Sequence, residues 1–291
     1  MRNSILLGGA VALLASLPFT SFADDTANLG SPIVVTATRT AMIADQEVAP
    51  VIVITAQQIQ LSGAQTIGAL LQQYTGLDIA SNGGPGQPTS LFLRGTNSNQ
   101  TLVMINGVKI NPADGSGAAL QNIHLNNIER IEIVKGPRAA LYGSDAIGGV
   151  INIITRQASE GMHYGARVGA GRYGTYDNGG HFDYGQGDSA FGVSASNYHT
   201  DGFQAVAGTN FNSGNTDRTW NAYSRTVLSG VDVNLKHWQS TGNTQFTQFS
   251  SNPPYALAPF DENYSNQTTS LDLTGHFLTG WRSNLNLSHM L

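Results

Sequence analysis

The sequence contains no cysteine and little charge: only 11% of its 291 residues are charged. The fold therefore depends on no disulfide, and no site can use a thiolate ligand. The net charge is −5 and no basic run is longer than a pair, so nothing predicts a nucleic-acid partner. Beyond residue 23, no apolar run approaches the ~18 residues of a membrane-spanning helix.

Motifs for catalysis are also missing. There is no His-Glu-x-x-His helix and no serine elbow, and the seven histidines are scattered without the spacing of metal ligands. We therefore do not expect an enzyme.

The first 23 residues have the pattern of an export signal. Arg2 is followed by an apolar stretch from Ile5 to Leu17, and Ser21-Phe22-Ala23 places small residues where a signal peptidase cleaves. About thirteen apolar residues are too few to form a membrane anchor. We expect residues 1–23 to be removed on export.

Aromatic residues divide the rest of the chain into two regions. Three lie between Asp24 and Gly161, and nineteen lie between Met162 and Leu291.

Residues 46–156 have the pattern of a small α/β domain. Its expected strands are 51–54, 91–94, 101–105, 131–134 and 150–155, and its expected helices are 56–61 and 67–74, the second capped by Thr66. Asn106-Gly107 predicts a type I′ hairpin, and residues 83–87 a polar loop.

Residues 157–291 alternate between apolar and polar side chains, as in Met162 to Ala170 and Val231 to Lys236. This period of two predicts strands with one wetted face. A soluble β-sandwich has the same pattern, but segments of about ten residues favour a membrane barrel. Long polar stretches at 200–217 and 241–263 resemble extracellular loops. Aromatic residues near segment ends resemble interface girdles, namely Tyr173, Tyr176, Tyr184, Tyr198, Trp220, Trp238 and Trp281.

Residues 24–45 form a polar segment without periodicity, which we expect to be flexible. Within it, Ile33, Val34, Val35, Thr36 and Ala37 form a β-prone pentad. The pentad could be an exposed strand that adds to the sheet edge of a partner, or an ordinary first strand of the domain.

At this point a family resemblance becomes clear. The pentad resembles the TonB box of TonB-dependent outer-membrane receptors. The stretches "LLQQYTGLDI", "LFLRGTN", "LVMINGVKI" and "IERIEIVKGPRAALYGSDAIGGVINIITR" resemble the plug domain of that family in the same order. The cobalamin receptors are the branch most similar to this chain, through "NGGPGQPTSLFLRGTN" and "GPRAALYGSDAIGGVINIIT".

The resemblance implies an α+β plug domain inside an antiparallel transmembrane β-barrel in outer-membrane lipid. It implies TonB as periplasmic partner and cobalamin as ligand. The family's plug contacts fall here on Pro88, Ser90, Asn97, Gly115 and Ser116. Pro88 and Gly115 depart from the expected residue types, and Pro88 has no backbone N–H to donate.

The resemblance also suggests calcium ligands at Asp217 and Asp261. Gln204, Thr219 and Thr247 stand where further carboxylates are expected, and calcium needs six to eight oxygen ligands. We therefore expect two solvated loop aspartates rather than a calcium site. No other cofactor is expected.

Three arginines of the plug region, Arg94, Arg130 and Arg138, would be costly to bury without a partner. The plug interpretation predicts acidic partners for them on the inner barrel wall. The alternative is that they are solvated surface residues.

The 130 residues after Gly161 give room for roughly six to eight strands, whereas plugged barrels have about 22. We therefore expect the barrel to be incomplete in this chain. Three alternatives stay open. The first is a ferric siderophore or haem receptor of the same family, the second a secreted β-rich adhesin, and the third a passive porin.

Overall fold

The computed structural model describes residues 34–35, 42–43, 51–74, 76–249, 257–278 and 281–291. Residues 34–291 form one compact unit. The expected export signal and Ile33, Thr36 and Ala37 of the pentad lie outside the described residues.

Val34 and Val35 form β1 (Val34–Val35), which pairs antiparallel with β2 (Met42–Ile43). The middle of the pentad therefore pairs with a neighbouring segment of the same chain.

A small domain follows, built on a five-stranded sheet in the order β3-β8-β9-β6-β7. Its strands are β3 (Val51–Thr55), β6 (Thr101–Ile105), β7 (Val108–Lys109), β8 (Ile128–Lys135) and β9 (Gly149–Thr155). All seven residues of β9 are buried, as expected for a central strand with both faces covered. A separate hairpin joins β4 (Leu77–Ser81) to β5 (Thr89–Leu93); the sequence pattern did not predict β4.

Helix α1 (Ala56–Leu61) has the predicted bounds, and a capping box between Thr55 and Gln58 fixes its start. Helix α2 (Ile67–Leu71) begins after its predicted cap, Thr66, but ends three residues earlier than expected. Its last turn tightens, because the amides of Gln73 and Tyr74 bond to carbonyls three residues back. A third short helix, α3 (Ala139–Tyr142), was not predicted.

The Asn106-Gly107 turn was predicted correctly. Both residues have positive φ, 52° and 84°, and Ile105 pairs with Val108 across the turn. The Asn106 side chain also bonds to Thr155, which ties this hairpin to the end of β9.

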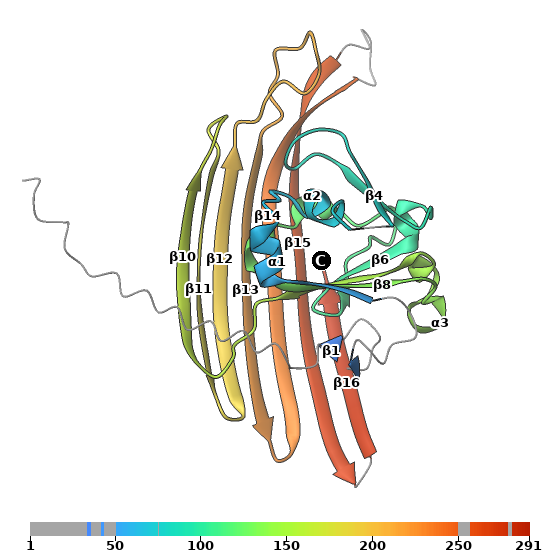
Figure 1. The fold of residues 1–291 in the computed structure, drawn as a ribbon, viewed down its shortest axis with the longest axis vertical. Coiled ribbons are helices and arrows are strands. Elements are labelled where there is room, and N and C mark those ends of the chain that lie inside the picture. The colour runs from blue at the N-terminus through green and yellow to red at the C-terminus, as the bar shows by residue number, and fades with distance from the viewer. Residues whose placement is uncertain (1–33, 36–41, 44–50, 75, 250–256, 279–280) are drawn as a thin grey trace, which may run out of the picture. The chain divides into compact units, whose positions relative to one another are not determined.

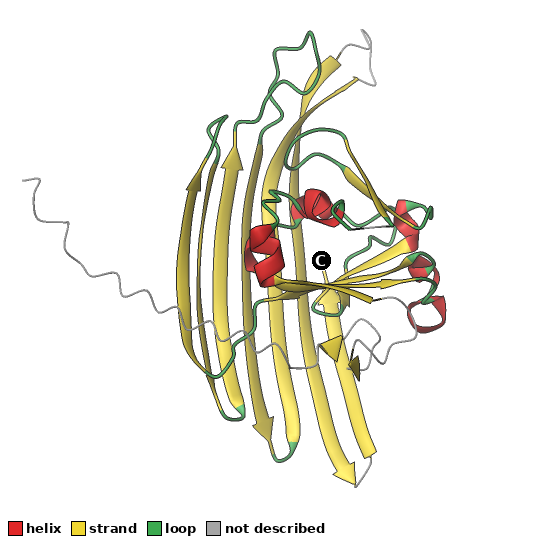
Figure 2. Cartoon of the chain, in the orientation of Figure 1, coloured by secondary structure: helices red, strands yellow, loops and turns green. Residues whose placement is uncertain are grey.

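The rest of the chain is one long antiparallel sheet in which each strand pairs with its neighbour in sequence (Figure 1). Among the described residues, the helices all lie in the small domain and the long sheet has none (Figure 2). Its strands are β10 (Gly161–Ala170), β11 (Tyr176–Gln186), β12 (Ser189–Thr200), β13 (Asn215–Leu228), β14 (Val231–Phe249), β15 (Leu257–Leu278) and β16 (Trp281–Met290).

Two of these strands are much longer than predicted. Strands β14 and β15 have 19 and 22 residues, and the register runs without interruption from Val231↔Gly275 to Phe249↔Leu257. The expected loop at 241–263 is therefore wrong for most of its length. Its composition is polar, but cross-strand pairs such as Phe246–Phe260, stacked at 5.9 Å, continue the ladder. The other expected loop is present, at residues 201–214.

The two faces of the long sheet differ in chemistry. One face buries polar side chains such as Asp183, Ser196, Asn221 and Ser270, whereas the other exposes large apolar ones. The exposed set includes Tyr164, Val168, Phe182, Phe191, Val193, Trp220, Leu235, Leu285 and Leu287. An apolar outer face with a polar inner one is the pattern of a barrel wall in lipid.

The predicted girdle of aromatic residues is only partly correct. Tyr173, Tyr176 and Trp220 are exposed, but Tyr198 and Trp238 are buried on the inner face. Trp238 belongs to the hydrophobic core of the small domain, so packing against that domain decides its direction. The Trp281 side chain lies outside the described part of the structure.

No helix among the described residues is long and apolar enough to cross a membrane.

Candidate functional site

Hydrogen bonds between uncharged groups and single carboxylates join the small domain to the polar face of the long sheet. The Ser240 hydroxyl oxygen lies 2.9 Å from the carbonyl oxygen of Asn122, and the Asn126 side-chain amide donates to Asp177 at 2.7 Å. Asn127 donates to Ser196 at 3.3 Å. Hydrogen bonds require a defined geometry, so this contact fixes the orientation of the domain on the sheet. Each bond between uncharged groups contributes only about 1 kcal/mol.

Asp217 is the most heavily bonded side chain of this interface. It lies on β13 and is 1% exposed, and it accepts hydrogen bonds from Thr219 at 2.7 Å, Ser240 at 2.5 Å and Tyr264 at 2.7 Å. The expectation of a solvated loop aspartate is wrong at this position. The hydroxyls come from three adjacent strands, β13, β14 and β15. Pairing across the sheet therefore creates the site, and no short sequence motif predicts it.

His124 of the small domain completes this cluster. Its Nε2 lies 3.7 Å from Oδ1 of Asp217, and its ring lies 4.9 Å from the ring of Tyr198. The cluster formed by His124, Tyr198, Asp217, Ser240 and Tyr264 is called the interface cluster below. It joins the small domain to four strands of the long sheet, β12 to β15.

The loop between β4 and β5 packs against the other end of the interface. Gln87 is buried and donates to the backbone carbonyl of Gln245 at 2.9 Å. A Cβ on Gly86 would meet the Asn215 amide at 2.2 Å, and one on Gly84 would meet the Phe203 ring at 3.0 Å. Glycine is therefore required at position 86, where this loop passes β13, whereas a Cβ at position 84 would need only a small shift of the Phe203 ring.

The five predicted ligand contacts fall on three segments of the small domain. Pro88 is exposed at the end of the β4–β5 loop, and Ser90 is half-buried on β5. Asn97 is exposed before a short 3-10 turn, and Gly115 and Ser116 are exposed on the loop after β7. The structure holds the last two segments together, because a Cβ on Gly117 would meet the Ser98 hydroxyl at 2.4 Å.

The loop at 112–117 is shaped by Asp114. Its carboxylate accepts from the backbone amide of Ser116 at 2.8 Å and from the Ser116 hydroxyl at 2.7 Å. These two bonds lower the pKa of Asp114 below its ordinary value, with the backbone bond as the larger cause. Ser116 therefore uses its hydroxyl proton on its own loop and presents its oxygen as an acceptor.

The expected wall partners of the arginines are wrong for Arg130. Its guanidinium bonds to Glu129 at 2.8 Å and to Glu132 at 2.9 Å, both on β8 with it. Arg94 is exposed, with φ at 54°. Burial lowers the pKa of the neighbouring Lys135, and repulsion from Arg94 lowers it further.

Comparison with known proteins identifies the small domain. Residues 44–150 match the TonB-dependent Receptor Plug Domain. The plug domain packs against the polar face of a sheet whose other face is apolar, as a plug does against a barrel wall. The fold is therefore an α+β plug domain with part of the antiparallel transmembrane β-barrel that surrounds it.

Solved receptors share this arrangement. A mutant of the ferric enterobactin receptor of Pseudomonas aeruginosa is similar with a TM-score of 0.64 and 19% identity, over 89% of this chain and 42% of that one. The ferripyoverdine receptor of the outer membrane of Pseudomonas aeruginosa gives 0.69 and 15%, over 89% and 36%. The alcaligin outer-membrane receptor of Bordetella pertussis gives 0.66 and 16%, over 88% and 41%. The chain thus spans about two fifths of the length of these receptors.

The two aspartates suggested as calcium ligands differ in environment. Asp217 directs its oxygens at the hydroxyls of Thr219, Ser240 and Tyr264. Asp261 is exposed on β15, opposite Gln245. Among the described residues, no three His, Cys, Asp or Glu side chains are grouped in a way that could hold a metal ion.

Proposed function

We propose that this chain is part of a TonB-dependent receptor of the bacterial outer membrane, which takes up a scarce, large ligand with energy supplied through TonB. The observation that carries the proposal is the plug domain, bonded to the polar face of a sheet whose opposite face exposes aromatic and aliphatic side chains. A passive porin has no such domain in its lumen, and a soluble adhesin would not expose this apolar face to water.

The ligand site proposed is the exposed group of Pro88, Ser90, Asn97, Gly115 and Ser116, together with barrel loops. Support comes from the exposure of four of the five and from the contact between Gly117 and Ser98, which places two of the three segments together. Small polar groups on loops suit a large polar solute that is bound by several weak hydrogen bonds.

Two ligand classes are proposed. Cobalamin is supported by the sequence resemblance around residues 82–97. A ferric siderophore is supported by the likeness to solved receptors for ferric enterobactin, ferripyoverdine and alcaligin. Competition for the protein in whole cells, with cyanocobalamin against ferric enterobactin and ferric alcaligin, separates these classes.

For energy coupling we propose the pentad Ile33 to Ala37 as the strand that TonB captures. The described part, β1, already pairs with β2 in an extended conformation, so TonB would replace one short pairing by another. Sequential pairing of this kind lets a pulling force reach the plug domain without a new fold.

The test is deletion of residues 33–37. Uptake of the labelled ligand should fall to the level of a strain without TonB, whereas ligand binding to whole cells should stay unchanged. A control deletion of residues 25–29 in the preceding polar segment should affect neither. Loss of binding on deletion of 33–37, or extraction of the protein from membranes without detergent, would contradict the proposal.

A further inference from the structure

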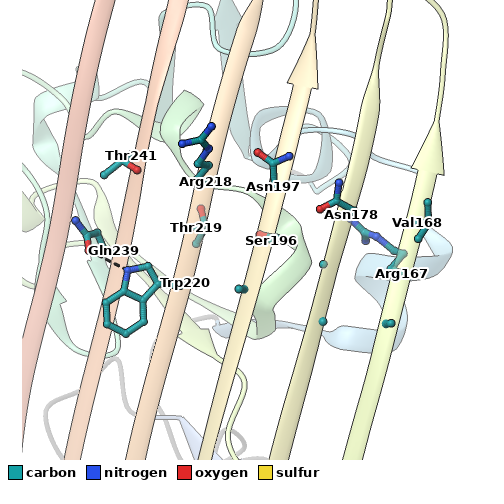
Figure 3. Close-up of a pocket in the computed structure, with 14 residues that line it drawn as sticks. Arg167, Val168, Asn178, Ser196, Asn197, Arg218, Thr219, Trp220, Gln239 and Thr241 are labelled. Atoms are coloured by element: carbon teal, nitrogen blue, oxygen red, sulfur yellow. Dashed lines mark hydrogen bonds between the residues drawn. The ribbon is translucent and has the colours of Figure 1, made fainter.

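The outer face of the long sheet contains a hollow of about 650 Å³ that the proposed transport function does not use (Figure 3). Its floor is made of three small residues from adjacent strands, Ala166, Gly180 and Ala195. The register places them in one row, with Ala166 opposite Gly180 and Gly180 opposite Ala195. The volume lies within the ~300–1,000 Å³ of small-molecule sites.

One end of this row is closed by an aromatic wall. Trp220 lies opposite Ala195 on β13, and its indole N–H donates to Gln239 at 2.9 Å (Figure 3). The ring of His237, on β14 like Gln239, lies 4.5 Å from the indole. Trp220 is therefore held in place although it is 43% exposed, so the hollow is built into the sheet rather than left by a mobile side chain.

The next row toward the long loops begins with Val168 on β10 and is otherwise polar. It contains Asn178, Asn197 and Arg218, which the register places opposite one another on β11, β12 and β13 (Figure 3). Arg218 is exposed, and among the described residues no carboxylate forms an ion pair with it. Two other strand arginines of the sheet whose side chains are described, Arg167 and Arg225, are paired with Asp177 and Asp232.

An apolar niche below an unpaired guanidinium is complementary to one kind of molecule, an amphiphile with an acyl chain and an anionic headgroup. The guanidinium binds a phosphate in a bidentate manner, and the two asparagine amides offer further donors. The floor offers only alkyl surface, which suits a hydrocarbon chain. Both parts lie where an outer-leaflet lipid would lie if the apolar face is in the membrane and the long loops point outward.

We propose that this hollow is a binding site for a phosphorylated lipid of the outer leaflet. Its acyl chain lies over Ala166, Gly180 and Ala195 against Trp220, and its phosphate is bound by Arg218, Asn178 and Asn197. The inference rests on the proposed membrane location, but not on the identity of the transported ligand.

The test uses the full-length protein, purified in mild detergent and titrated with dioleoyl phosphatidic acid while lipid adducts are counted by native mass spectrometry. Arg218→Gln should weaken this binding about tenfold, because it removes a charge-assisted contact. Ala195→Leu should weaken it similarly by filling the floor. Two matched controls should bind as the parent does. Arg172→Gln removes a charge at the β10–β11 turn. Val193→Leu enlarges an exposed residue on β12, two residues before Ala195 and on the same face of the sheet.

Two further titrations separate the parts of the site. Dioleoylglycerol, which lacks phosphate, should bind to the parent at least tenfold more weakly than phosphatidic acid does. Its affinity should not change with Arg218→Gln. Inorganic phosphate should not compete with the lipid at equal concentration. Equal binding of phosphatidic acid by Arg218→Gln, Ala195→Leu and both controls would overturn the inference, and so would competition by inorganic phosphate.

Folding of each variant is checked by its heat-modifiable mobility, and Ala166→Leu replaces Ala195→Leu if the latter does not fold. Binding of the transported ligand is measured on the same samples. A protein that binds this ligand but no phosphatidic acid overturns the lipid site alone. A protein that is soluble without detergent overturns the receptor proposal instead.

Discussion

The Nε2 atom of His124 lies 3.7 Å from Oδ1 of Asp217, so an imidazole of the plug domain faces the most heavily bonded carboxylate of the wall. Asp217 receives three hydroxyl hydrogen bonds in addition, and the Ser240 hydroxyl that supplies one of them also lies 2.9 Å from the carbonyl of Asn122. One buried carboxylate thus connects the plug domain with three strands, and its removal should destabilise the whole interface.

Asp217→Asn tests this connection. The amide offers one acceptor oxygen in place of two and introduces an N–H that faces hydroxyls already committed as donors. We expect a loss of about 1–3 kcal/mol in the free energy of unfolding, measured by denaturant titration in detergent. Asp261→Asn makes the same chemical change at an exposed position and should have no measurable effect. Equal loss in both variants would show that the two aspartates act together, for instance on a cation, and would contradict the role given to the interface cluster.

Gly86→Ala tests the contact between the β4–β5 loop and β13. The new Cβ would lie 2.2 Å from the Asn215 amide, which itself donates to Thr244 at 2.9 Å. We expect a loss of about 2–3 kcal/mol, of which about 1 kcal/mol comes from the positive φ, and a higher dissociation constant for the transported ligand. Gly95→Ala is the matched control. Gly95 has φ at 76° against 78° for Gly86 but has open space around it, so only the backbone cost should appear.

The ion pairs of Arg130 and Arg167 should differ in their contribution to stability. Arg130 bonds to Glu132, which is fully buried, whereas Arg167 pairs with Asp177 at the exposed edge of the sheet. Arg130→Gln removes the charge beside a buried glutamate and should cost about 3 kcal/mol. Arg167→Gln should cost less than about 1 kcal/mol. Thermal unfolding of the two variants beside the parent measures the difference, and similar losses would contradict the assignment.

The Lys109–Asp145 pair of the plug domain should make stability depend on pH in acid. The hydrogen bond from Lys109 lowers the pKa of Asp145 below its ordinary value of 3.8. Because the carboxylate is favoured in the folded state, the stabilisation is present above pH 3.8 and is lost as the pH falls through the lower, folded-state pKa. In the parent, the midpoint of unfolding should therefore decrease as the pH is lowered from 4 to 2. Lys109→Gln should make this fall shallower, and an unchanged slope would argue against the pair.

Local elements of the plug domain were predictable because their signals lie within a few residues. Asn106-Gly107 satisfies the positive φ that a tight hairpin needs, and Thr55 and Thr66 mark helix starts by bonding to amides three residues on. The end of α2 was not predictable to the residue, because a tightening of its last turn carries no sequence signature.

The candidate site was much less predictable, because it depends on which strands are neighbours. Asp217 reads as a loop aspartate beside a long polar stretch, and only the pairing of β13 with β14 and of β14 with β15 places Ser240 and Tyr264 around it. Trp238 was expected at a membrane interface, because its packing partners are not visible in the sequence. In the structure it packs into the hydrophobic core of the plug domain. The length of β14 and β15 exceeded the prediction, since cross-strand pairing stabilises polar sequence that shows no alternation.

The strand order of the two parts implies different routes of assembly. In the long sheet every strand from β10 to β16 pairs only with strands next to it in sequence. The sheet can therefore grow by adding one hairpin at a time, each closed by a segment of at most 14 residues. In the plug domain β3 must meet β8, and β6 must meet β9, across much longer intervening segments. Forming the sheet of the plug domain therefore has the larger entropic cost of loop closure. We expect this sheet to be completed after the first hairpins of the wall have formed.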